Sequence, residues 1–237
     1  MRLRSLTKHI REQNWFAVAL DFFIVVVGIL IAFQITNWNE GRKTAEQQDL
    51  VEARLINDFK IIDQSLEAAI SQHASLIRDL GTLRDNLDDG QADPKDDAAI
   101  KRTLVRMRTF PTYIRQSATY EELASSGTLG LIRNDALRDA IAQYDEQAGN
   151  RLFNIEQIRS SMQQVFINAA EYAQYEPLDR DNIKIRPIAS YDLKRMSEDK
   201  AFTQRLEYTL TMQTYIYDNL TLQRNEVDAV LQIMGLK

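Results

Sequence analysis

The sequence predicts an all-α protein in which an N-terminal transmembrane helix continues into an elongated antiparallel helical bundle. Three observations favour this fold class. An apolar run lies near the start of the chain, apolar residues recur at intervals of three and four over most of the remainder, and no linker rich in Pro, Gly or Ser divides the chain. About 200 residues follow the apolar run, which is enough for one helical core.

The apolar run covers residues 15–33 and is interrupted only by Asp21 and Gly28. Its nineteen residues are close to the ~20 that cross a hydrocarbon layer of ~30 Å as a helix. A signal peptide has a shorter apolar region, of about 7 to 15 residues, and ends in a cleavage site with small residues. This run instead ends in Phe33-Gln34-Ile35-Thr36-Asn37. We therefore expect it to be retained as a signal anchor.

Two tryptophans bracket the span. Trp15 and Trp38 are 23 residues apart, which corresponds to about 34 Å along a helix at ~1.5 Å per residue. That distance places both indoles at headgroup depth, where tryptophan is enriched. We interpret them as interfacial anchors and divide the chain into residues 1–14, a transmembrane helix 15–38 and a bundle domain 39–237.

The charges on either side of the span predict its orientation. Four basic residues precede it, whereas two follow it closely: Arg2, Arg4, Lys8 and Arg11 before, and Arg42 and Lys43 after. Because an excess of Lys and Arg marks the cytoplasmic side, the short N-terminus is expected in the cytoplasm and the bundle outside it.

A stripe of small residues with one carboxyl group lies on the predicted membrane helix. At 100° per residue, four side chains fall within about 40° of one another: Ala17, Asp21, Gly28 and Ala32. One interpretation is a helix–helix contact in the membrane, with Asp21 protonated or bonded to a partner helix. The other is that Asp21 reaches the cytoplasmic interface and that Gly and Ala are simply common in membrane helices. The sequence leaves both open.

Two segments of the chain carry a recognisable pattern: VVVGILIAFQITNWNEGRK, preceded by the acidic Asp21, and YEELASSGTLGLIRNDALRDAIAQYD. Together they resemble a family of uncharacterised bacterial membrane proteins known only as a domain of unknown function. Members of the family are expected to have Glu where this chain has Asp21. The resemblance implies a single-pass anchor followed by a helical domain, and it implies no activity, cofactor or catalytic residue. With the orientation above, it predicts a bacterial inner-membrane protein whose bundle is periplasmic.

After the membrane span, spacings of three and four predict a long helix with a coiled-coil-like seam. Its seam residues are Leu55, Phe59, Ile62, Leu66, Ala69, His73, Leu76, Leu80, Leu83 and Leu87. Gly90 is expected to end this helix as a left-handed C-cap.

Further capping signals delimit the remaining helices. Asp93-Pro94 opens a short helix to about Arg108, and Thr119 with Glu122 forms a capping box for a brief helix that Gly127 closes. A long helix follows from Asn134 to a point before Pro177. Its predicted face consists of Leu137, Ile141, Tyr144, Ala148, Leu152, Ile155, Ile158, Met162, Val165, Ala169 and Tyr172.

The last predicted elements are a loop and a final helix. Residues 177–190 form the one long non-helical stretch, in which Ile183, Ile185 and Ile188 alternate with polar residues. Ser197 is expected to cap the final helix. Its seam is Leu206, Leu210, Gln213, Tyr217, Leu220, Arg224, Val227, Leu231 and Met234.

The residues available for chemistry are few, so we expect no enzyme, no cofactor and no metal. The chain has no cysteine and two histidines, His9 and His73, and His73 belongs to the seam of the first long helix. No Gly-x-Ser-x-Gly elbow surrounds Ser125 or Ser126. A net charge of −5 argues against nucleic acid as a partner.

Two classes of function are left. The first is a non-catalytic interaction or scaffolding module that contacts the lipid bilayer and either a second copy or another membrane protein. The alternative is an extracytoplasmic ligand-sensing bundle of the four-helix type that signals through a partner in the membrane, with an unknown small ligand.

Overall fold

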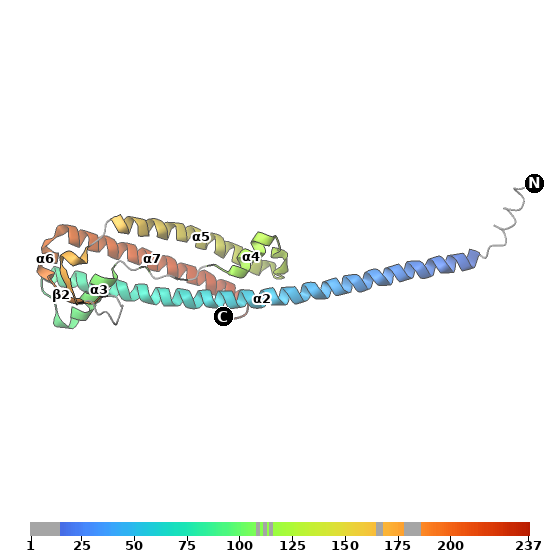
Figure 1. The fold of residues 1–237 in the computed structure, drawn as a ribbon, viewed down its shortest axis with the longest axis horizontal. Coiled ribbons are helices and arrows are strands. Elements are labelled where there is room, and N and C mark those ends of the chain that lie inside the picture. Colours follow the sequence, from blue (N-terminus) through green and yellow to red (C-terminus); the bar gives the residue numbers. More distant parts are fainter. Residues whose placement is uncertain (1–14, 108–109, 111–112, 114–115, 165–167, 178–185) are drawn as a thin grey trace, which may run out of the picture. The chain divides into compact units, whose positions relative to one another are not determined.

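A computed structural model describes residues 15–107, 110, 113, 116–164, 168–177 and 186–237, without the side chains of Trp15, Ala17 and Gln164. The all-α class is confirmed, because helices account for most of the described chain (Figure 1). The chain forms two compact units, which are described separately below. The first ends at Val51 and the second covers Glu52–Lys237.

Helix α2, Trp15–Asp89, is a single unbroken helix that belongs to both units. In the second unit its predicted seam is confirmed, since all ten seam residues from Leu55 to Leu87 are buried. The helix ends where Gly90 adopts a φ of +69°, as expected for a left-handed C-cap. Because only glycine adopts this φ without strain, Gly90 sets the end of α2.

Two short helical elements follow α2 and are tied back to it. Asp93 caps the 3-10 helix η1 (Pro94–Asp96), which leads into α3 (Asp97–Arg106). The Arg102 guanidinium of α3 donates to both carboxylate oxygens of Asp79 on α2, at 3.0 and 3.2 Å. The predicted end of this helix at Arg108 lies outside the described residues.

Helix α4 (Ala118–Ser126) is capped by Ser117, so the prediction of Thr119 as the cap is wrong. The Ser117 hydroxyl accepts from the backbone N–H of Tyr120 and donates to Asp58 of α2 at 2.7 Å. Asp58 also accepts the backbone N–H of Thr119 at 3.0 Å. A carboxylate of another helix therefore completes this cap, a contact that the local sequence pattern does not contain.

The second long helix is α5 (Asp135–Gln164), which follows the 3-10 helix η2 (Leu129–Leu131). Asn134 opens it, as predicted, by accepting from the backbone N–H of Leu137. The helix is shorter than predicted. Ala169 and Tyr172, expected on its face, lie in and just after the 3-10 helix η3 (Ala169–Glu171), and Val165 lies outside the described residues.

The second unit contains a small sheet that the sequence pattern does not predict. β1 (Ala173–Tyr175) pairs antiparallel with β2 (Ile188–Tyr191), with an irregularity between Gln174 and Tyr175. Part of the predicted loop, including Ile188, is therefore strand, whereas Ile183 and Ile185 lie outside the described residues. Two strands of three and four residues are too short for the alternation of side chains to be read reliably.

The final helices are α6 (Leu193–Glu198) and α7 (Lys200–Ile233). Ser197 lies inside α6, so its prediction as the cap of the last helix is wrong. Asp199 caps α7, because its carboxylate accepts the backbone N–H groups of Ala201 and Phe202. A capping residue has a non-helical backbone, as Asp199 does. Ser197 instead lies within α6, so its side chain does not cap α7.

The side-chain pairs give the directions of the long helices. The Arg224–Asp63 ion pair, at 3.0 Å, places Arg224 of α7 beside Asp63 of α2. Between α5 and α7, Gln223 donates to Tyr144 and Ser161 bonds to Tyr208, so residue numbers rise on one helix as they fall on the other. Helix α7 is thus antiparallel to α5, and Figure 1 shows both alongside the later part of α2.

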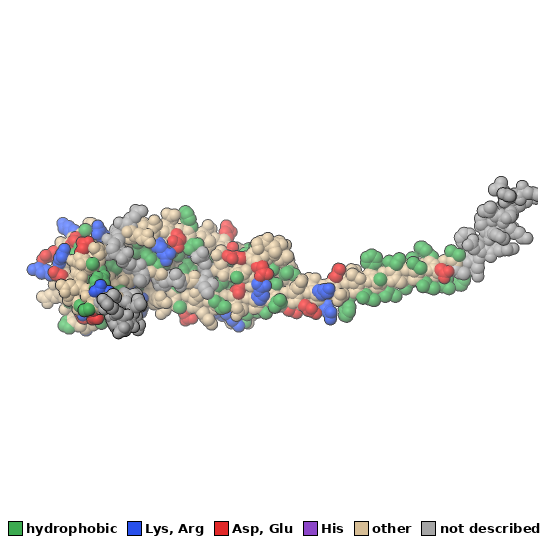
Figure 2. Space-filling view, in the orientation of Figure 1, with side chains coloured by type: hydrophobic (Ala, Val, Ile, Leu, Met, Phe, Trp, Pro, Cys, Tyr) green, Lys and Arg blue, Asp and Glu red, His purple; other side chains and the backbone are tan. Residues whose placement is uncertain are grey.

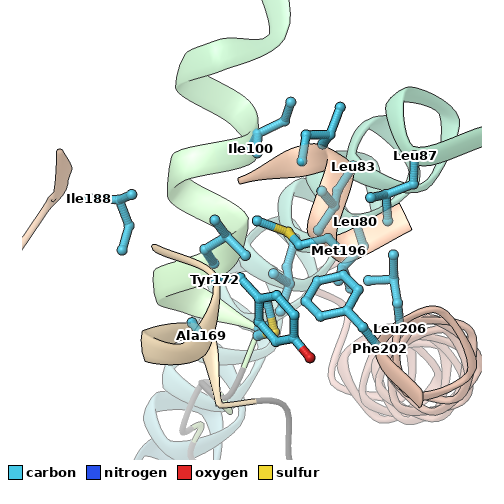
Figure 3. Close-up of a cluster of buried hydrophobic side chains, with 14 residues drawn as sticks. Leu80, Leu83, Leu87, Ile100, Ala169, Tyr172, Ile188, Met196, Phe202 and Leu206 are labelled. Atoms are coloured by element: carbon cyan, nitrogen blue, oxygen red, sulfur yellow. The ribbon is translucent and has the colours of Figure 1, made fainter. Parts of the chain in front are cut away.

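One end of the second unit holds a dense apolar cluster, drawn in Figure 3. It joins the end of α2 to α3, η3, β2, α6 and the start of α7. The rings of Tyr172 and Phe202 meet edge to face with their centroids 4.8 Å apart. Met196, from the short helix α6, is fully buried in the same cluster. This packing accounts for the position of the small sheet.

Candidate functional site

The first candidate is the apolar part of α2 in the first unit. Thirteen of the twenty large apolar side chains that are exposed in the described chain lie between Phe16 and Trp38. Figure 2 shows apolar side chains along the visible face of this part of the helix, with an acidic side chain near its N-terminal end. Within the described residues, one helix is long and apolar enough to cross a membrane, and it is this one. Apolar surface of this extent is expected in lipid rather than in water.

Three of the four residues of the predicted stripe can be placed. Asp21, Gly28 and Ala32 are exposed on α2, whereas the side chain of Ala17 lies outside the described ones. A methyl group added at Gly28 would meet no atom within 4 Å, so the chain itself gives no packing reason for this glycine. Of the two predicted interfacial anchors, Trp38 is 71% exposed and the side chain of Trp15 is not described. Contact through this stripe stays a prediction.

A second face of the same helix carries a hollow of about 430 Å³. It is lined by Val27, Leu30, Ile31, Gln34, Ile35 and Trp38. Gln34 is exposed and makes no hydrogen bond with any described residue. Thr36 differs, because its hydroxyl donates to the carbonyl of Ala32 at 3.0 Å within the helix.

The second candidate is a group of polar side chains inside the bundle. His73 on α2 is 2% exposed, and Gln213 and Gln223 on α7 are fully buried. Gln223 donates to the hydroxyl of Tyr144 on α5 at 3.0 Å. Several buried atoms have no hydrogen-bond partner: Nδ1 of His73, both amide atoms of Gln213, and Oε1 of Gln223. Such atoms are costly in an apolar core, so this group is an unusual feature of the fold.

Burial controls the protonation of these groups. It lowers the pKa of His73 below its ordinary value, and the nearby Gln213 carboxamide opposes this in part, although its geometry is not that of a hydrogen bond. Burial likewise raises the pKa of the Tyr144 phenol. Both side chains are therefore neutral near pH 7, so the bundle interior holds polar groups without charge.

The spacing of residues in the sequence predicts only part of this buried polar group. His73 and Gln213 appear in the predicted seams, but Gln223 does not. The signal was present, because Gln223 continues the three-four spacing of Gln213, Ile216 and Leu220. Conversely, Arg224 was assigned to the seam and is instead half-buried beside it, paired with Asp63 and Glu67.

A third feature is an open polar groove of about 760 Å³ at the end of the second unit. It is bordered by the turn at Gly90, by both short strands and by the start of α6. Beside it, the Tyr172 phenol donates to Asp199, which raises the pKa of Tyr172 to about 12 and lowers the pKa of Asp199. The Arg195 guanidinium lies over the Tyr172 ring and donates to the carbonyl of Glu171. These side chains bond to one another and so brace the α6–α7 corner.

Among the described residues, no three His, Asp or Glu side chains lie close enough together to hold a metal ion. The expectation of a protein without metal, cofactor or enzymatic activity is not tested by this observation and stays a prediction.

The described features define a helical protein with one helix suited to a membrane. A family model described as "Family of unknown function (DUF6090)" matches residues 21–175, which is more than half of the chain. The chain belongs to this family, and the resemblance stated from the sequence is thereby confirmed. No curated protein and no solved structure matches it.

Proposed function

We propose that the protein is a single-pass inner-membrane protein with a cytoplasmic N-terminus, whose periplasmic bundle contacts other proteins without catalysing a reaction. The main support is the unbroken helix α2. It is apolar and exposed between Phe16 and Trp38, and it then becomes a core helix of the second unit. A bundle that shares a helix with its own membrane anchor is suited to present a binding surface next to one membrane.

The charge bias around the span supports the orientation. Alkaline phosphatase, which is active only outside the cytoplasm, should be active when fused after Lys237. The matched control is a fusion of the same enzyme directly after Arg11, which should be inactive. Activity of a cytoplasmic reporter at Lys237, with an inactive phosphatase, would contradict the proposed orientation.

The interaction role is tested by recovering the intact protein from membranes after crosslinking in cells. The control replaces residues 52–237 by an unrelated helical domain behind the same first 51 residues. We expect at least one protein to be recovered with the native chain and not with the control. Equal recovery from both would argue against a bundle that binds protein.

The stripe formed by Ala17, Asp21, Gly28 and Ala32 is a proposed contact face for such partners in the membrane. Asp21→Asn keeps the size of the side chain and replaces its carboxyl group by an amide, so a contact that requires the carboxyl group should be lost. An unchanged set of crosslinked partners would favour the simpler interpretation, in which Asp21 reaches the interface.

The buried polar group favours a second candidate function, a ligand-sensing bundle. Nδ1 of His73 and the amide of Gln213 are buried without partners, as expected of groups that await a polar molecule. Amino acids and dicarboxylates are suitable probes. A ligand should raise the melting temperature of the native protein and leave that of the His73→Leu/Gln213→Leu variant unchanged. Equal shifts in both proteins would exclude this site.

A further inference from the structure

Gln34 is the polar centre of an otherwise apolar face of the membrane helix. It lies about 140° around the helix axis from Asp21, so this face is separate from the stripe of small residues. Its neighbours Ile31 and Ile35 are more than half exposed, as is Trp38. The hollow of about 430 Å³ on this face leaves room for side chains of a partner.

The Gln34 carboxamide has hydrogen-bonding groups that the helix does not use. It makes no hydrogen bond with any described residue, and it lies four residues, or about 6 Å, inside Trp38. If Trp38 marks the interface, the amide reaches the hydrocarbon side of it, where water is scarce and unpaired polar groups are costly. A partner helix that offers both a donor and an acceptor at this depth would satisfy it.

We propose that this partner is a second copy of the chain, packed through the Gln34 face. This proposal rests on the membrane location proposed above. Two copies inserted in the same orientation are parallel, so their Gln34 side chains lie at the same depth. A carboxamide is self-complementary, because each copy can donate its N–H to the oxygen of the other. The result is a two-fold symmetric contact, with Ile31 and Trp38 packing on either side of the amide pair.

The absence of cysteine in the sequence allows a direct test in the full chain. Single cysteines are introduced at Val27 and Ile31, on the proposed face, and at Gly28 and Ala32, on the stripe. Native membranes are then oxidised, and only protein that resists alkaline carbonate extraction is scored. We expect disulfide-linked dimers at Val27 and Ile31, with little product at Gly28 and Ala32.

The role of the amide is tested in the Val27→Cys background. Gln34→Leu should lower the dimer yield by about threefold to tenfold, the range expected for one hydrogen-bonded contact between membrane helices. Thr36→Val is the matched control. It also removes a polar group near the same boundary, but Thr36 already bonds within its own helix and lies about 160° from Gln34. The dimer yield should therefore stay unchanged.

The outcomes separate this proposal from the proposed function. One contrary result is the formation of disulfide-linked dimers through cysteines at Gly28 and Ala32, with a yield that Gln34→Leu does not change. That result would overturn the contact through the Gln34 face and assign it to the stripe. Membrane-bound protein with no dimer at any of the four positions would overturn self-association but keep the membrane location. Extraction of the whole protein by carbonate would overturn both.

Discussion

Helix α2 carries two kinds of apolar surface, and their difference explains the two units of the protein. Between Phe16 and Trp38 large apolar side chains point in all directions and are exposed, whereas from Leu55 to Leu87 they form one buried seam. A helix that is apolar all round needs a surrounding apolar solvent, whereas a helix with a seam needs partner helices. We therefore expect the same secondary structure to be stabilised by lipid in one unit, whereas α5 and α7 stabilise it in the other.

The largest expected effect comes from adding charge to the exposed apolar unit. Each lysine near the centre of a membrane helix costs about 2.5–3.5 kcal/mol, so Val25→Lys/Ile29→Lys should release the protein from the membrane. Alkaline carbonate extraction measures the released fraction. Gln64→Lys/Gln72→Lys, at exposed positions of α2 in the bundle, is the matched control and should leave the protein in the pellet.

Removing one aromatic ring from each region sharpens the same comparison. Phe59→Ala leaves a cavity in the core and should lower the free energy of unfolding of the bundle by about 3–5 kcal/mol. Phe59 is fully buried and meets the Tyr144 ring at 5.4 Å between centroids. Phe22→Ala, at a position 71% exposed, should leave bundle stability unchanged. Urea unfolding followed by circular dichroism in detergent measures both; equal losses would contradict the division into two environments.

The buried polar group makes the seam less stable than an apolar one. Since His73 and Gln213 both carry unpartnered atoms, replacing both by leucine removes a desolvation penalty and should stabilise the bundle by about 1–3 kcal/mol. Replacing only Gln213 tests whether the two act together. A destabilised double variant would show that the polar side chains hold a water molecule or a ligand that the bundle needs.

The smallest expected effect is on the pH dependence of stability. Burial lowers the pKa of His73 in the folded protein, so the unfolded chain binds more protons once the pH falls below about 6.5. The contribution of His73 is complete above this pH and is lost as the pH falls toward the lower folded pKa. Unfolding measured between pH 7.5 and 5 should show this loss, and His73→Leu should flatten it. An equal slope in the variant would assign the dependence to other groups.

Helices, their seams and several caps could be predicted from the sequence, because these depend on the spacing and chemistry of neighbours along the chain. The seam of α2, the left-handed Gly90 and the capping residue Asn134 are examples. The cap of α7 at Asp199 was not predicted, because Ser197 and Asp199 are both residue types that commonly cap a helix, and spacing alone does not choose between them. The Gln34 face was likewise not assigned, since its hollow depends on the shapes of side chains from three turns.

The sequence by itself determined the helical class, the apolar span and the buried side of α2 in the bundle, because periodicity and composition act locally. Only the tertiary structure decided that Asp58 completes the cap of α4, that β1 pairs with β2 and that the Gln223 amide donates to Tyr144. Each of these contacts joins residues at least thirteen positions apart, and the first and last of them join different helices. Their partners become neighbours only when the helices have packed, so no local pattern could identify them.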